Sequence, residues 1–195
     1  MKLILASGSP RRRELLAMLD IDFRVDTSRP VEETVPAGMA PEEVPAYLSR
    51  LKAGPYTATL APDEVLVTAD TVVILDGEVI GKPRDAAEAK SVLSRLSGRV
   101  HTVVTGVSLT LPGRTPHTFS ETTHVEFSAI SAEEIDYYVR RYSPLDKAGA
   151  YGIQEWIGAA AVKGMTGSFY NVMGLPVNRL YRELKQLLQR DFIHE

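Results

Sequence analysis

Short apolar runs alternate with amphipathic segments along most of this sequence, and this alternation limits the folds that the chain can adopt. Residues 2–6 are almost wholly apolar and predict a buried strand. Residues 10–19 place leucines at helical spacing and predict an amphipathic helix, while residues 22–27 alternate as a second strand does. A strand, a helix and a strand in succession favour an α/β fold.

The rest of the chain continues this alternation, with a hairpin signal in between. Asp76-Gly77 separates two apolar runs and predicts a two-residue hairpin. Asp85 predicts the N-cap of one helix, and the spacing of Ser131 and Glu134 is a capping box for another. The sequence therefore predicts an α/β protein with a mixed, twisted sheet and flanking helices. The predicted strands are Glu64–Ala69, Val72–Leu75, Glu78–Ile80, Val100–Leu111, Thr122–Phe127 and Ala159–Val162, and the predicted helices are 41–52 (ended by Gly54-Pro55), 86–96, the segment from Ser131 to Arg141, and Val177–Gln189.

Composition narrows the class of protein. The chain has 195 residues, enough for one sizeable domain or two small lobes, and it has no cysteine, which excludes disulfides, thiolate catalysis and cysteine-ligated zinc. A net charge of −3 provides no general attraction to nucleic acid, so no stable nucleic-acid binding is expected. No apolar run approaches about 20 residues and no signal-peptide pattern is present, so we expect a cytoplasmic protein without membrane association.

Consecutive arginines, Arg11–Arg13, stand at the start of the predicted helix 10–19. Ser9 is a good N-cap and Pro10 fits the first helical position. A cation at a helix N-terminus is unfavourable by roughly 0.3–1 kcal/mol, so this placement makes sense if an anion binds there. The segment predicts either a phosphate-binding turn or a solvated basic first turn. It is not a Walker A loop, because the required glycine and lysine pattern is absent.

Asp70 follows the apolar run Glu64–Ala69 and is predicted to lie where that strand ends. Binding sites in open α/β sheets gather at the carboxyl ends of strands. An aspartate there can bind Mg²⁺ or Mn²⁺ and activate a water, as hydrolysis of a phosphoanhydride requires. The alternative is a turn-forming aspartate. Glu32 and Glu33, in a polar connection, are either solvated or able to complete a metal site with Asp70.

Two lysines are candidates for phosphate contacts. Lys82 lies in Gly81-Lys82-Pro83, where the proline restricts the backbone, so its ammonium can be presented to an anion. A solvated lysine is the alternative. Lys52 lies near the end of the predicted helix 41–52, where it also complements the helix C-terminus, so position alone does not assign it to phosphate.

Residues 146–154 form a glycine-spaced loop that carries polar and aromatic side chains. Small residues allow a ligand to approach the backbone closely, and the Gln154 amide has both a donor and an acceptor for the edge of a base. An ordinary ordered loop is the alternative interpretation.

Several short segments, each modest alone, occur in one order: Leu5–Arg12, Ala69–Thr71, Gly81–Pro83, Leu96–Gly98, Pro144–Gln154 and Val172–Pro176. Together they resemble the Maf family of nucleoside triphosphate pyrophosphatases over nearly the whole chain. The resemblance implies a fold similar to that of inosine triphosphate pyrophosphatases, with two lobes around a cleft in a single domain over 1–195. It also implies that a homodimer is common.

The resemblance further implies roles for individual residues. Asp70 matches the proton acceptor, and Glu33 matches an acidic position linked to metal or water, so that the two would hold Mg²⁺ or Mn²⁺, with Co²⁺ as an alternative. The positions associated with the triphosphate are Ser9, Arg12, Lys52 and Lys82.

The family has a branch that acts on dTTP and UTP and a branch that acts on 7-methyl-GTP. Arg11, Thr71 and Gln154 resemble the dTTP/UTP branch. A neutral amide suits the O4 and N3–H edge of uracil or thymine, whereas a carboxylate would repel its carbonyls.

These observations lead to the expectation of a metal-dependent hydrolase that converts dTTP and UTP to the monophosphate and pyrophosphate. One alternative is the same chemistry on 7-methyl-GTP or on modified nucleotides. Another is a regulator of cell division that binds a nucleotide without hydrolysing it.

Overall fold

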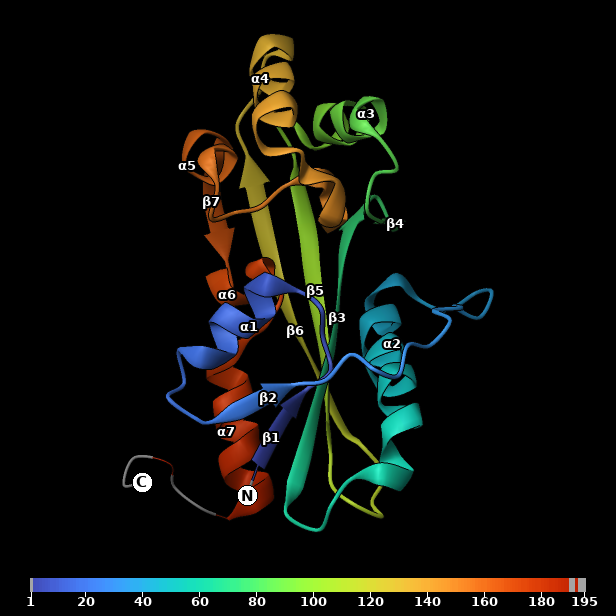
Figure 1. Cartoon of the computed structure of the whole chain (residues 1–195). Helices are drawn as coiled ribbons and strands as arrows, with labels where there is room; N and C mark the ends of the chain where they lie inside the picture. The colour runs from blue at the N-terminus through green and yellow to red at the C-terminus, as the bar shows by residue number, and fades with distance from the viewer. Residues whose placement is uncertain (1, 190–191, 193–195) are drawn as a thin grey trace. The chain divides into compact units, whose positions relative to one another are not determined.

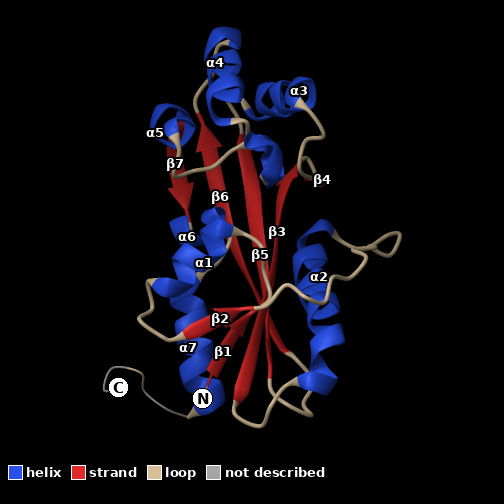
Figure 2. Ribbon diagram, in the orientation of Figure 1, coloured by secondary structure: helices blue, strands red, loops and turns tan. Residues whose placement is uncertain are grey.

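The structure, a computed structural model, describes residues 2–189 and 192, so both ends of the span 1–195 lie outside the described residues. The chain separates into two compact units. Figure 1 shows the path of the chain and Figure 2 its helices and strands. The first unit contains Met1–Asp70, Thr105–Glu121 and Gly174–Glu195, and the second contains Thr71–Val104 and Thr122–Met173.

The first unit is built on parallel strands. β1 (Lys2–Leu5) pairs parallel with β2 (Phe23–Val25) and with the first part of β3 (Glu64–Leu75). Parallel neighbours need a crossover, and the helices α1 (Pro10–Ala17) and α2 (Val44–Ala53) supply these crossovers. Figure 1 shows α2 on one side of these strands and α1 on the other, together with the closing helix α7. α7 spans Val177–Leu188.

Apolar side chains on β1 and β3 explain why these segments form the centre of the first unit. Ile4 and Leu66 are buried and pack with Ala53 and Tyr56 from the α2 region. β1 is buried at three consecutive positions, as expected for a parallel strand covered on both faces. The predicted strand–helix–strand start of the chain is confirmed.

The second unit contains the predicted hairpin and the predicted helix caps. β3 pairs antiparallel with β4 (Glu78–Ile80) around Asp76-Gly77, and both turn residues have positive φ, as a type I′ turn requires. The Asp85 side chain accepts from Glu88 N at the start of α3 (Ala86–Leu96). The capping box of Ser131 is present at the start of α4 (Ala132–Tyr142). The remaining elements of this unit are α5 (Trp156–Ala161), β7 (Val162–Thr166) and α6 (Phe169–Met173).

Long strands contribute to both units: β3, β5 (Val100–Thr110) and β6 (His117–Phe127). The strands are hydrogen-bonded in the order β2-β1-β3-β5-β6-β7, and β4 pairs with β3. Because β6 and β7 are antiparallel whereas β1 and β3 are parallel, the sheet is mixed. The predicted α/β fold class is therefore confirmed.

Some predicted boundaries are wrong. Ala159–Val162 is not a strand, because α5 runs to Ala161 and β7 begins only at Val162. Consecutive alanines favour a helix over a strand, and this propensity prevails here. Gly54-Pro55 ends α2 but not the helical path, which continues as a 3-10 helix over Gly54–Thr59. Among the residues described, no helix combines the length and apolar character needed to cross a membrane.

Candidate active site

The turn after β1 positions the start of α1. Ala6 N donates to Val67 O at 3.0 Å, and the chain then leaves the sheet. The Ser9 side chain accepts from Arg12 N at 3.4 Å, while Ser9 N donates to Ser7 Oγ at 3.3 Å. The predictions that Ser9 caps this helix and that Pro10 begins it are confirmed.

Arg12 joins separate segments of the first unit. Its Nε donates to Gly174 O at 2.9 Å, and its Nη1 donates to Ala69 O at 2.8 Å and to Ser7 Oγ at 3.4 Å. Burial lowers the pKa of the Arg12 guanidinium from its usual value, and the nearby Asp70 carboxylate acts in the opposite direction. Arg12 therefore fixes the backbone directly before Asp70 and adds positive charge beside it.

Asp70, Lys52 and Glu33 form an ionic cluster in the first unit. Lys52 Nζ lies 2.6 Å from Asp70 Oδ1 and 3.0 Å from Glu33 Oε2. The side chains of Lys52 and Asp70 are 18% and 13% exposed, so the pair is screened less than a surface ion pair is. Lys52 lies on α2, Asp70 on β3 and Glu33 in the connection between β2 and α2. The structure thus brings together residues that the sequence predicted separately.

Asp70 lies within a strand rather than at its end, which corrects the sequence prediction. β3 continues without interruption from Glu64 to Leu75. Its parallel neighbour β1 stops at Leu5, which is paired with Val67, so Asp70 lies beyond the carboxyl end of β1. Sites in α/β sheets gather at the carboxyl ends of strands, and here the strand that ends at the site is β1 rather than β3.

The carboxylates of Asp70 and Glu33 suit a hard divalent cation. Both direct an oxygen at one position, which Lys52 Nζ occupies. Among the described residues, no group of three or more His, Cys, Asp or Glu side chains could hold a metal. Mg²⁺ is often bound by one or two carboxylates together with water and substrate phosphates, so this donor set fits a cation that arrives with a phosphorylated substrate.

Lys82 and Gln154 belong to the second unit, and both are exposed. Gly149 N donates to Gly81 O at 3.2 Å, so the loop that precedes Gln154 is hydrogen-bonded to the segment that carries Lys82. Gly149 has a φ of +70°, and a Cβ there would lie 2.8 Å from the Val73 side chain. The structure therefore brings these two predicted segments together within the second unit.

The other predicted specificity residues are sequence neighbours of Arg12 and Asp70. Arg11 precedes Arg12 in α1, and Thr71 follows Asp70 in β3. Both residues are half-buried.

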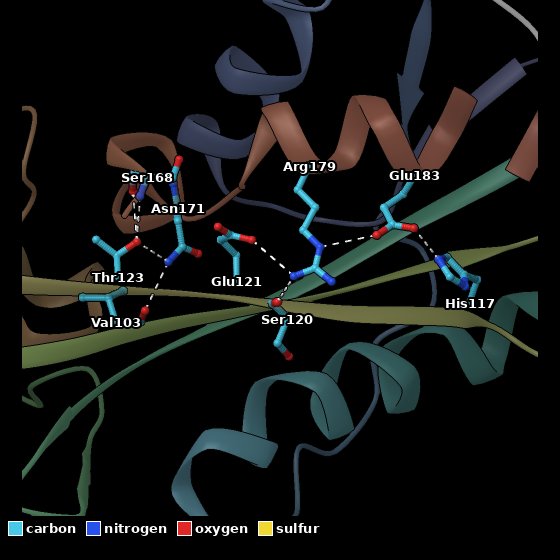
Figure 3. A network of polar contacts seen from close by, with 9 residues as sticks. All are labelled: Val103, His117, Ser120, Glu121, Thr123, Ser168, Asn171, Arg179 and Glu183. Carbon is cyan, nitrogen blue, oxygen red and sulfur yellow. Dashed lines mark hydrogen bonds and ion pairs between the residues drawn. The ribbon is translucent and has the colours of Figure 1, made fainter. Parts of the chain in front are cut away.

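Gly174, which binds Arg12 through its carbonyl, is the link between two anchored helices. In the second unit, Asn171 of α6 donates to Val103 O at 3.1 Å and to Thr123 Oγ1 at 2.9 Å (Figure 3). In the first unit, Arg179 of α7 donates to a backbone carbonyl of β6 (Figure 3). Both neighbours of the link are thus held in place by polar contacts of their own unit.

Sequence reasoning missed Ser7 and Gly174 as partners of Arg12. Ser7 lies in the turn before α1, and nothing in the sequence distinguishes its hydroxyl from that of Ser9. Gly174 acts through its carbonyl, which leaves no signal in the side-chain pattern. Its φ of +118° lies in the region that favours glycine, which is a local reason for glycine at this position.

The fold and the cluster together define an α/β protein whose first helix carries a half-buried arginine next to an aspartate–lysine pair. Comparison with known proteins agrees with this class. A family model described as Maf-like protein matches residues 2–187. The chain belongs to the Maf family.

Similar proteins include relatives named dTTP/UTP pyrophosphatase. The chain is 54% identical to one from Phocaeicola vulgatus over 186 residues, which cover 95% of this chain and 96% of the relative. It is 52% identical to one from Bacteroides thetaiotaomicron, with the same coverage of 95% and 96%. The solved structure of a HAM1 protein from Coxiella burnetii is similar with a TM-score of 0.52, at 18% identity over 95% of this chain and 99% of that one. This last similarity concerns the fold alone.

Proposed function

We propose that this protein hydrolyses dTTP and UTP to the nucleoside monophosphate and pyrophosphate. The observation that carries the proposal is the ionic cluster in which Lys52 lies between Asp70 and Glu33, beside half-buried Arg12. The names of relatives that are about half identical over nearly their whole length support the same reaction and the same bases.

Asp70 acts in this proposal as the base for a water that attacks the α-phosphorus. Its carboxylate is held by Lys52, and its backbone is held through the carbonyl of Ala69 by Arg12. An incoming triphosphate offers Lys52 a partner with more negative charge than Asp70 has, so the ammonium moves its pairing to phosphate. Asp70 is then able to accept a proton, while Lys52, Arg12 and Lys82 neutralise charge on the departing pyrophosphate.

Asp70 and Glu33 are proposed to hold Mg²⁺ or Mn²⁺, with Co²⁺ as a possible substitute. When bound, such a cation neutralises charge on the phosphates. The two carboxylates orient it, and Ser9 contributes a hydroxyl at the start of α1, where anions are favoured.

Base recognition is proposed to involve Arg11, Thr71 and Gln154. The exposed Gln154 amide can donate to O4 and accept from N3–H of uracil or thymine. The amide is uncharged, which avoids repulsion of the base carbonyls.

The test of this function compares Asp70→Asn with Asp63→Asn. Removing the base is expected to lower kcat for dTTP and UTP by about 10²–10⁴-fold, because asparagine cannot accept the proton. Asp63 pairs with Lys2 at an exposed place before β3, so its variant should keep full activity. Pyrophosphate release measures the rate, and thermal unfolding checks that both variants are folded. An Asp70→Asn enzyme with wild-type turnover contradicts the proposal.

The same assay separates the proposal from its alternatives. A panel of dTTP, UTP, CTP and 7-methyl-GTP, each with Mg²⁺, Mn²⁺ and Co²⁺, identifies the base and the metal. Tight binding of dTTP without release of product would instead indicate a nucleotide-binding regulator.

We further propose that 1–195 functions as a single domain of two lobes, in the cytoplasm and as a homodimer. The family resemblance supports the dimer, and the exposed side chains of Met165, Phe169 and Tyr170 are candidates for its interface. Light scattering coupled to size-exclusion chromatography measures the oligomeric state directly.

A further inference from the structure

The hydroxyl of Tyr138 binds the chain on both sides of Gln154. Tyr138 is fully buried in α4, and its Oη accepts from Gly152 N at 3.0 Å. The same hydroxyl donates to Glu155 Oε2. Burial and the Glu155 carboxylate raise the pKa of Tyr138, so the hydroxyl keeps the proton that it donates. One side chain thus fixes the residue two before Gln154 and the residue directly after it.

The Glu155 carboxylate is held through both of its oxygens. Oε2 accepts from Tyr138, and Oε1 lies 3.1 Å from Lys147 Nζ. Lys147 is only 9% exposed at its side chain and also pairs with Asp146 at 2.7 Å. A charged, largely buried group with partners on both oxygens has little freedom to rotate.

Gly152 leaves room for the Gln154 side chain to lie against the backbone. A Cβ at position 152 would lie 3.0 Å from Gln154 Nε2 and 2.8 Å from Glu155 Cδ. The glycine therefore lets both side chains pack over the loop at once. Gln154 itself stays exposed, while Gly152 and Ile153 before it are buried.

The orientation of the Gln154 amide matters because a glutamine can pair with two pyrimidines. In one orientation its amide pairs with the O4 and N3–H of uracil, and after a half-turn it pairs with the N4–H and N3 of cytosine. Only an amide that is held in one orientation discriminates between them. The contacts around Gln154 restrict the backbone from which this side chain extends.

We propose that Tyr138 and Glu155 are positioning residues that make base recognition by Gln154 selective for uracil and thymine over cytosine. This inference rests on the proposed function, since it assigns Gln154 to the base. Neither residue contacts the reacting atoms in this assignment. Their effect is on selectivity and on KM rather than on the chemical step.

The test measures kcat/KM for UTP and CTP in Tyr138→Phe and Glu155→Gln. Tyr138→Phe removes both hydrogen bonds of the hydroxyl, and Glu155→Gln removes the charge that pairs with Lys147. Each variant is expected to lower the UTP-to-CTP ratio of kcat/KM by about 10-fold, mainly through a higher KM for UTP. kcat for UTP at saturation should change by less than about 2-fold.

Glu126→Gln is the matched control, because it breaks an exposed glutamate–lysine pair with Lys163 in the same unit. This control should keep the wild-type ratio. A reduced melting temperature with an unchanged ratio in both variants means that the network is only structural, and it overturns the inference. If Tyr138→Phe does not fold, the ratio of Glu155→Gln decides alone.

Failure of the proposed function has a different signature. A wild-type protein that hydrolyses neither dTTP nor UTP contradicts that function itself. A wild-type protein that hydrolyses UTP and CTP equally well has no selectivity to position, which also overturns this inference.

Discussion

Arg12 shows how one planar cation can organise backbone that is distant in sequence. A guanidinium presents its N–H donors in a fixed fork, and Arg12 directs them at the carbonyls of Ala69 and Gly174. Carbonyl groups carry no net charge, so these two hydrogen bonds leave the positive charge of the Arg12 guanidinium in place. Arg12 therefore combines support of the backbone with positive potential at the site of Asp70.

Replacement of Arg12 by lysine tests this double role. Lysine keeps the charge but cannot bind both carbonyls in the same geometry, so Arg12→Lys should lower the free energy of unfolding by about 2 kcal/mol. kcat should fall as well, because the backbone before Asp70 loses its support. Urea unfolding and pyrophosphate release measure the two effects.

Arg13→Lys is the control for this variant, since Arg13 is the exposed neighbour in the same helical turn. It should resemble the wild type in both assays. Equal behaviour of the Arg12 and Arg13 variants would show that the two carbonyl contacts do not matter.

Residue chemistry made the candidate site partly predictable. Asp70, Lys52 and Glu33 could each be nominated from side-chain type and local setting, but each also had an ordinary alternative. Their meeting at one nitrogen depends on the register of β3 against β1 and on the position of α2, neither of which the sequence states. No local pattern in the sequence predicts the contact between Tyr138 and Glu155. The two residues are 17 positions apart, with Tyr138 in α4 and Glu155 directly before α5.

At the scale of elements, caps and turns were more predictable than the ends of strands. Asp85 and the Ser131 capping box act within one helical turn, so their local chemistry decides the outcome. The continuity of β3 through Asp70 depends on pairing with other strands, which overrides the polar interruption of the apolar run. The predicted strand Ala159–Val162 is wrong because the small apolar residues at its start suit both strands and helices.

The packing of α2 on β5 depends on the absence of a side chain at Gly106. A Cβ at this position would lie 2.3 Å from backbone atoms of Pro45 and Ala46. Since α2 carries Lys52, Gly106→Ala should displace that lysine from Asp70 as well as destabilise the fold. We expect a loss of about 3 kcal/mol in the free energy of unfolding and a lower kcat.

Gly54→Ala is the matched control at the other end of the same helix, because a Cβ there meets nothing within 4 Å. It should leave both stability and activity close to those of the wild type. A fully active Gly106→Ala enzyme would show that the fit of α2 on β5 does not set the position of Lys52.

At the scale of the whole molecule, alternation of apolar runs was enough to predict the class of fold. It could not predict that the chain divides into units whose segments are interleaved, because that division depends on contacts between residues far apart in sequence. The long strands that serve both units are the physical reason. Each reads as one element, although its two ends belong to different units.

The stability of the protein should depend on pH through His101. This histidine is 1% exposed, and its Nε2 lies 2.7 Å from Tyr151 Oη. Burial lowers the pKa of His101 to about 4. Below its ordinary pKa of about 6.5, the unfolded chain therefore binds a proton that the folded chain does not, and stability falls as the pH falls from about 6.5 to about 4.

Urea unfolding at about pH 7 and about pH 4, in the wild type and in His101→Gln, measures this contribution. The wild type should lose about 3 kcal/mol more than the variant between the two conditions. Other acid-titrating groups are common to both proteins and cancel in the comparison. An identical loss in both would mean that His101 is not kept neutral by the fold.

Arg12 and its acceptor Gly174 lie 162 positions apart in the sequence, and this separation has a consequence for synthesis on the ribosome. Translation delivers Asp70 and Lys52 first, and the Gly174 carbonyl that completes the hold on Arg12 is made only after both segments of the second unit. A nascent chain that terminates before this glycine carries the acidic and basic groups of the ionic cluster but lacks the last segment of its unit. The hydrogen bonds of Arg12 are therefore completed only once the second unit has been synthesised, so a fragment released earlier carries an incomplete site.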